Sequence, residues 1–136
     1  MTTKLTNGVH HIGLTVPDLD QARAFFCGLL GFDEVGGVAS YPSIFVSDST
    51  ILLTLWRPAD PLTARAFDRR ANIGLHHLSL AVADYSALDK AWERVSAHPE
   101  VVVDSPPGPI RPGSTTRHFL VFIPGGIRIE FATPFA

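Results

Sequence analysis

Two adjacent histidine pairs, His10-His11 and His76-His77, stand in nearly the same local sequence 66 residues apart. Residues 8–18 read GVHHIGLTVPD, and residues 74–84 read GLHHLSLAVAD. A repeat of this length indicates a duplicated structural unit. Two equivalent histidines from such units can meet at one metal ion, because neutral imidazole is a common ligand of divalent cations.

Side-chain alternation predicts which histidine of each pair faces a ligand. Successive residues of a strand point to opposite faces, so His11 and His77 lie opposite the aliphatic residues that must pack against helices. Glu130 falls on the same open face of the predicted last strand, while His10 and His76 point the other way and are interpreted as structural. A single histidine is more often structural than a ligand, but two imidazoles and a carboxylate can hold a divalent cation and leave positions open for substrate.

Both copies are predicted to contain a strand, a helix and three further strands. In the first copy we expect a strand over 9–16 and a helix that is capped by Asp18 or Asp20 and ends at Gly31. Strands over about 32–38, 42–47 and 50–57 follow, with a turn at Asp48-Ser49.

In the second copy we expect a strand over 75–82, a helix capped by Asp84, and strands near 99–104, 116–123 and 127–133. Residues 124–126 form the last turn. The proline-rich stretch 105–114 is predicted to be a stiff loop, because proline lacks a backbone donor and fixes φ.

The chain of 136 residues is expected to be a single α+β domain (residues 1–136) with modules at about 8–57 and 74–133 and a linker at about 58–73. The linker is expected to be solvated surface, although one of Arg65, Arg69 and Arg70 can alternatively reach an anionic substrate group. A net charge of −2 gives no reason to expect nucleic acid or membrane as a partner. A single cysteine and no apparent secretory signal favour the cytoplasm.

The sequence resembles the vicinal oxygen chelate superfamily, which includes glyoxalase I, fosfomycin-resistance proteins, methylmalonyl-CoA epimerase and extradiol dioxygenases. The resemblance lies in residues 11–18, 24–32, 77–84 and 124–131. The family phrase Asp-Pro-Asp-Gly-Asn-x-x-Glu is altered here at Ile123, Gly125 and Ile127, and Glu130 is retained.

The resemblance implies two tandem βαβββ modules that form a half-open barrel, and a homodimer with its site at the subunit interface. It implies His11, His77 and Glu130 as ligands of Fe²⁺, Mn²⁺, Ni²⁺ or Zn²⁺, with Glu130 also catalytic. The family's fourth ligand position falls on Thr54, which is a poor ligand, so three protein ligands are expected. That set matches fosfomycin transferases and ring-cleaving dioxygenases better than four-ligand bacterial glyoxalases.

Three functions remain open. The first is a glyoxalase- or fosfomycin-type enzyme with lyase, isomerase or transferase chemistry on a small substrate chelated through neighbouring oxygens. Fosfomycin itself is disfavoured, because Gly13 stands where those enzymes have threonine.

The second is an Fe(II) extradiol dioxygenase, in which Trp56, Phe45 and Phe122 either line an aromatic pocket or belong to the core. His118 is the spare histidine, either an acid or base or a surface residue. The third is a metal-free module that binds a small hydrophobic molecule. The sequence names no substrate.

Overall fold

The computed structural model describes residues 2–135, and the chain divides into two compact units, Met1–Leu62 and Thr63–Ala136. Each unit contains one helical segment and one four-stranded mixed sheet. The predicted α+β class with two tandem βαβββ modules is therefore confirmed. The unit boundary falls inside the predicted linker, and the joining of both modules into one domain stays a prediction.

The first unit has the strand order β1-β4-β3-β2. Its strands are β1 (Ile12–Thr15), β2 (Asp33–Val38), β3 (Ser43–Ser47) and β4 (Leu52–Trp56). β1 and β4 run parallel, and the other two pairings are antiparallel. Asp48 accepts hydrogen bonds from the backbone of Thr50 and Ile51, which confirms the predicted turn between β3 and β4.

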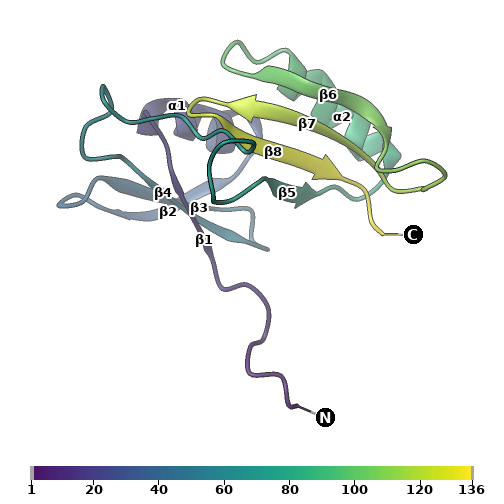
Figure 1. Ribbon diagram of the computed structural model, residues 1–136, viewed down its shortest axis with the longest axis horizontal. Coiled ribbons are helices and arrows are strands. Elements are labelled where there is room, and N and C mark those ends of the chain that lie inside the picture. Colours follow the sequence, from purple (N-terminus) through teal and green to yellow (C-terminus); the bar gives the residue numbers. More distant parts are fainter. Residues whose placement is uncertain (1, 136) are drawn as a thin grey trace. The chain divides into compact units, whose positions relative to one another are not determined.

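The second unit repeats this topology in the order β5-β8-β7-β6. Its strands are β5 (Leu78–Ala81), β6 (Val102–Pro109), β7 (Arg117–Ile123) and β8 (Ile127–Ala132). β5 and β8 run parallel, and β6–β7 and β7–β8 are antiparallel. Helix α2 (Tyr85–Ser96) contacts β6, β7 and β8, and Figure 1 shows it covering one face of this sheet.

Both helices begin at the predicted aspartates. Asp18 accepts a hydrogen bond from the backbone of Gln21 before α1 (Leu19–Arg23), and Asp84 accepts one from Ala87 before α2. The first helix is not a regular α-helix throughout. Residues 24–29, which were expected to continue it, form a π-helical segment, η1 (Ala24–Leu29). Its wider turn accompanies the burial of two consecutive rings, Phe25 and Phe26.

Both first strands are shorter than predicted. Regular pairing begins at Ile12 and Leu78, so His11 and His77 lie immediately before their strands and not within them. The aliphatic face is as expected, since Leu14, Val16, Leu78 and Leu80 are buried. The histidines therefore sit where the backbone enters the sheet.

The prediction that residues 105–114 form only a loop is wrong for its first half. β6 continues through Ser105-Pro106-Pro107-Gly108-Pro109. β6 is an edge strand, and among residues 2–135 it pairs with β7 alone. Its register shifts twice, between Val103 and Ser105 and between Ser105 and Gly108. Proline has no backbone N–H to donate to a neighbouring strand. An edge strand with bulges tolerates it, because few backbone N–H groups there take part in pairing.

Part of the predicted linker belongs to the second unit. The backbone of Phe67 donates a hydrogen bond to the carbonyl of Gly125 in the β7–β8 turn. The neighbouring Gly126 has a φ of +73°, and a Cβ there would collide with the carbonyl oxygen of Phe67. This close approach and the positive φ explain why glycine occupies position 126.

The core of the second unit lies between its sheet and α2. Phe119 of β7 stacks on Phe131 of β8 at 4.7 Å and meets Trp92 of α2 edge-on at 5.3 Å. Side chains at alternate positions of β7 and β8 therefore lie on the opposite face. Within residues 2–135, no helix is long and apolar enough to cross a membrane.

Candidate functional site

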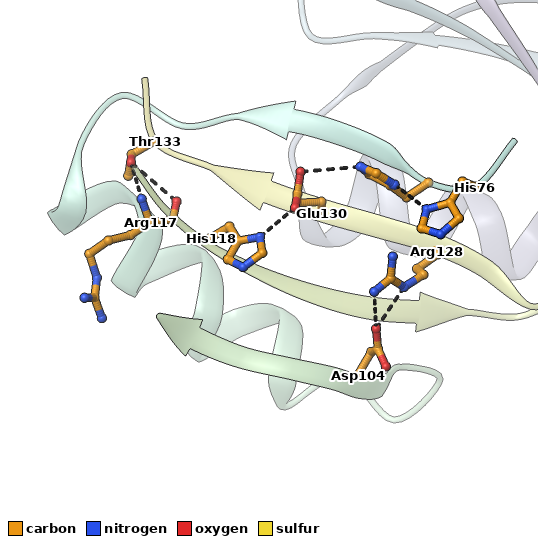
Figure 2. Close-up of polar contacts among 8 residues, drawn as sticks. His76, Asp104, Arg117, His118, Arg128, Glu130 and Thr133 are labelled. Atoms are coloured by element: carbon orange, nitrogen blue, oxygen red, sulfur yellow. Dashed lines mark hydrogen bonds and ion pairs between the residues drawn. The ribbon is translucent and has the colours of Figure 1, made fainter. Parts of the chain in front are cut away.

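Glu130 is a buried carboxylate on the sheet face opposite α2. It lies between Ile129 and Phe131 on β8, and its side chain is 9% exposed. The Nδ1–H of His118 on β7 donates to Glu130 Oε2 at 2.6 Å, as Figure 2 shows. Ser79, which faces Glu130 across the β5–β8 pair, also donates a hydrogen bond to it. A buried carboxylate requires such partners.

These contacts keep Glu130 ionised. Burial by itself raises the pKa of a carboxylate, but hydrogen bonds from His118 and Ser79 and electrostatic attraction to His118 and His77 outweigh it. The pKa of Glu130 is therefore held below its ordinary value. At neutral pH the group is an acceptor that can bind a cation or take up a proton.

His77 faces the other oxygen of this carboxylate. Its Nε2 lies 3.7 Å from Glu130 Oε1, which is too long for a hydrogen bond. Two donors held about 2.1 Å from one tetrahedral cation lie about 3.4 Å apart. A small movement would bring both atoms to that spacing, so this nitrogen–oxygen pair fits a divalent cation.

The outer histidine of each pair contacts the inner one. The Nδ1 atoms of His76 and His77 lie 2.8 Å apart, and those of His10 and His11 are also 2.8 Å apart. Desolvation and the charges of His77, Arg128 and Arg69 lower the pKa of His76, which favours its neutral form. The outer histidines, interpreted as structural, are thus hydrogen-bonded to the predicted ligands.

Thr54 occupies the position in the first unit that matches Glu130 in the second. Gly13 pairs with Thr54 in parallel strands, just as Ser79 pairs with Glu130. Thr54 is buried, and its hydroxyl accepts a hydrogen bond of 2.9 Å from the indole N–H of Trp56. The hydroxyl therefore has a structural partner, which supports the three-ligand expectation.

Replacement of Thr54 by valine should destabilise the protein by about 1 kcal/mol, because the Trp56 indole loses its acceptor. Urea unfolding of Thr54→Val, Trp56→Phe and the double variant forms a double-mutant cycle that isolates this bond. We expect a coupling free energy of about 1 kcal/mol. Additive effects of the two substitutions would contradict the assignment.

Arg128 flanks the carboxylate two residues earlier on β8. Its Nε and Nη2 lie 2.8 and 2.7 Å from Asp104 Oδ2 on β6 (Figure 2). Arg128 also lines a cavity of about 260 Å³ together with Arg69, whose guanidinium lies 5.8 Å from the centre of the Phe122 ring. Of the linker arginines, Arg69 is half-buried, whereas Arg65 and Arg70 are exposed.

The structure thus brings together His77, Glu130 and His118 in the second unit. His118 is half-buried and bonded to Glu130, so the alternative of a surface residue is wrong. The three do not converge on one point, since His118 binds the second oxygen. Within residues 2–135 no three histidine, cysteine, aspartate or glutamate side chains are grouped closely enough to hold a metal. His11, Thr54 and Trp56 belong to the first unit.

Sequence reasoning missed Ser79 and the ion pair of Arg128 with Asp104. Ser79 was detectable, because it lies two residues after His77 and therefore shares its face. The ion pair depends on the register between β6, β7 and β8, which residue types alone do not determine.

A sequence model of the Glyoxalase/Bleomycin resistance protein/Dioxygenase superfamily matches residues 8–131 of the chain. The chain belongs to this superfamily. The predicted membership of the vicinal oxygen chelate group is confirmed by this match, and the solved structures described below have the same fold.

Two relatives of the superfamily are similar in sequence. A 2-epi-5-epi-valiolone epimerase from Actinomyces sp. is 31% identical over an alignment that covers 93% of this chain and 73% of that protein. A catechol-2,3-dioxygenase from Bacillus subtilis (strain 168) is 34% identical over 93 residues, which cover 64% of this chain and 30% of the dioxygenase. The dioxygenase is thus matched over less than a third of its length.

Solved structures of the superfamily share the fold. A glyoxylase/bleomycin resistance protein/dioxygenase domain from Frankia sp. EAN1pec has a TM-score of 0.79 at 23% identity, with 94% of this chain and 98% of that chain covered. A variant of the fosfomycin resistance protein FosX from Listeria monocytogenes, complexed with Mn(II) and 1S,2S-dihydroxypropylphosphonic acid, has a TM-score of 0.69 at 20% identity, covering 93% and 90%.

Proposed function

We propose that the chain is a divalent-metal-dependent enzyme that removes and returns a proton at the carbon next to a carbonyl group of a small, multiply oxygenated substrate, as an epimerase or isomerase does. The observation that carries this proposal is the ionised, buried Glu130, which His118 and Ser79 hold with one oxygen toward His77. The similarity to a 2-epi-5-epi-valiolone epimerase over 93% of the chain supports this reaction type over the other chemistries of the superfamily.

We assign His11, His77 and Glu130 as the metal ligands, with Fe²⁺, Mn²⁺, Ni²⁺ and Zn²⁺ as candidate ions. The His77–Glu130 geometry supports two of these ligands, and the repeat supports His11 as the equivalent of His77. The Mn(II) complex of the FosX variant makes Mn²⁺ the first ion to test. A bound divalent cation acts as a Lewis acid that polarises the oxygens of a chelated substrate.

Other steps of the proposed reaction depend on side chains of the protein. Glu130 is proposed as the catalytic carboxylate, because it is ionised at neutral pH and its Oε1 faces His77 rather than His118. His118 fixes the carboxylate through Oε2 and thereby orients Oε1. Thr54 and Trp56 are proposed to line the substrate site from the first unit.

Proton transfer is tested by solvent exchange. Mn²⁺-loaded protein is incubated in D₂O with 2-epi-5-epi-valiolone and with related polyhydroxylated ketones, and the reaction is followed by NMR. We expect deuterium to appear at the carbon next to the carbonyl together with the epimer, and a chelator to stop both. Normal epimer formation in the presence of excess chelator would contradict metal dependence, and absence of exchange with every ketone would contradict the proton transfer.

Ring cleavage of a catechol by an Fe(II) enzyme is the second candidate. It is supported by the 34% identity to catechol-2,3-dioxygenase, although the match covers only 30% of that protein. An oxygen electrode separates the two functions. Oxygen uptake by the Fe²⁺-loaded protein with a catechol panel would favour the dioxygenase, and our first proposal expects none.

We further propose a homodimer in which each site takes ligands from both subunits, as the family resemblance implies. Mixing of His11→Ala and Glu130→Gln proteins under subunit-exchange conditions tests this. In an interface site, one site of the mixed dimer carries no substitution, so activity returns. In a site built within one chain, every site carries one substitution and activity stays absent.

A further inference from the structure

The contact within each histidine pair is the same in both units. In each pair the two Nδ1 atoms are 2.8 Å apart and the ring centres are 5.1 Å apart, with interplanar angles of 78° for His10–His11 and 73° for His76–His77. The two pairs occupy equivalent positions of the duplicated unit. The same geometry is thus kept in both copies, which points to a shared role.

A bond between two Nδ1 atoms requires one ring to donate and the other to accept. If His76 donated, His77 would carry its own proton on Nε2, facing Glu130 Oε1. At 3.7 Å that proton makes no hydrogen bond with the carboxylate, and it would occupy the nitrogen that is proposed to bind the cation. If His77 donates, its Nε2 lone pair faces the carboxylate oxygen, and the two acceptors are placed to share a cation.

We propose that His10 and His76 are positioning residues that hold His11 and His77 as Nδ1–H tautomers, so that each inner ring presents the lone pair of Nε2 to the metal. This inference rests on the proposed function, since it assigns an outer partner to each proposed histidine ligand. Metal-binding histidines generally donate their second ring nitrogen to such a partner, which fixes the ring and raises its basicity. In this chain the partner is the preceding histidine.

The tautomer is observable without metal. In ¹⁵N spectra of the metal-free full chain, the ring nitrogens of His77 distinguish a protonated Nδ1 from a protonated Nε2. We expect Nδ1–H in the wild type and in His76→Asn, because the asparagine Oδ1 can accept where the His76 Nδ1 does. In His76→Leu we expect the proton to move to Nε2. His76 is exposed, so neither substitution threatens the fold.

Zn²⁺ affinity, measured by competition with a chelator, gives the second readout. We expect His76→Leu and His10→Leu to bind Zn²⁺ about 10–100-fold more weakly than the wild type, and the asparagine variants to recover most of this loss. A role limited to packing would not distinguish asparagine from leucine in this way.

The outcomes distinguish the proposed metal-dependent function from the positioning role of His10 and His76. Wild-type protein that binds no Zn²⁺, Mn²⁺, Fe²⁺ or Ni²⁺ overturns the proposed function, and this inference with it. Wild-type protein that binds metal while carrying the His77 proton on Nε2 in the metal-free state overturns the inference alone. Equal Zn²⁺ affinity of the leucine and asparagine variants does the same.

Discussion

Replacement of Glu130 by glutamine should abolish metal-dependent activity and weaken binding of Mn²⁺ or Zn²⁺ by at least about 100-fold. Substitution of a residue that only hydrogen-bonds a metal ligand typically weakens binding by about 10–100-fold, and loss of a ligand should cost more. The amide keeps the size of the side chain, and its oxygen can still accept hydrogen bonds from His118 and Ser79. It carries no negative charge and therefore binds a cation weakly. Calorimetric titration with each metal measures the affinity, and circular dichroism verifies the fold.

Glu93→Gln is the matched control, because Glu93 lies exposed on α2 and removal of its charge leaves the site untouched. This control should bind metal as the wild type does. If Glu130→Gln also retained wild-type affinity, the carboxylate would not be a ligand. The assignment of the site to this face of the second sheet would then lose its main support.

Replacement of Phe119 by alanine should destabilise the protein by about 3–5 kcal/mol, the range for truncation of a buried aromatic side chain. Phe119 is fully buried, stacked on Phe131 and in edge contact with Trp92. Its loss leaves a cavity between the sheet and α2, and this is a large share of the 5–15 kcal/mol that stabilises a typical domain. Urea unfolding measures the change.

Phe135→Ala provides the comparison, since the Phe135 side chain is 96% exposed and its removal should change stability by less than about 0.5 kcal/mol. Phe119 follows His118 on β7 and points to the opposite face. Its packing therefore fixes the strand that presents His118 to Glu130. A Phe119→Ala protein as stable as the control would show that this core does not support the site.

Much of the fold could be predicted because local signals and the global fold agree. The repeated phrase predicted two equal modules, and the aspartates before each helix predicted both caps. Strand alternation predicted that Glu130 and Phe131 lie on opposite faces of the sheet. These features depend only on neighbours along the chain. Each was therefore accessible from residue types and spacing.

Features that depend on strand register could not be predicted in the same way. Residues 105–109 look like a loop, but their place at a sheet edge with two register shifts lets them pair with β7. His118 looks like a surface residue until the β7–β8 register brings it 2.6 Å from Glu130.

The central proposal is that His11 of the first module and His77 and Glu130 of the second are ligands of one divalent cation. Metal analysis of untagged protein, purified without chelator and reloaded with Mn²⁺, tests it when wild type is compared with His11→Ala, His77→Ala and His98→Ala, the last being a histidine after α2 and outside the proposed set. We predict one ion per chain in wild type and His98→Ala and almost none in the other two. Full metal content in His11→Ala or His77→Ala, or none in the wild type, would contradict the account.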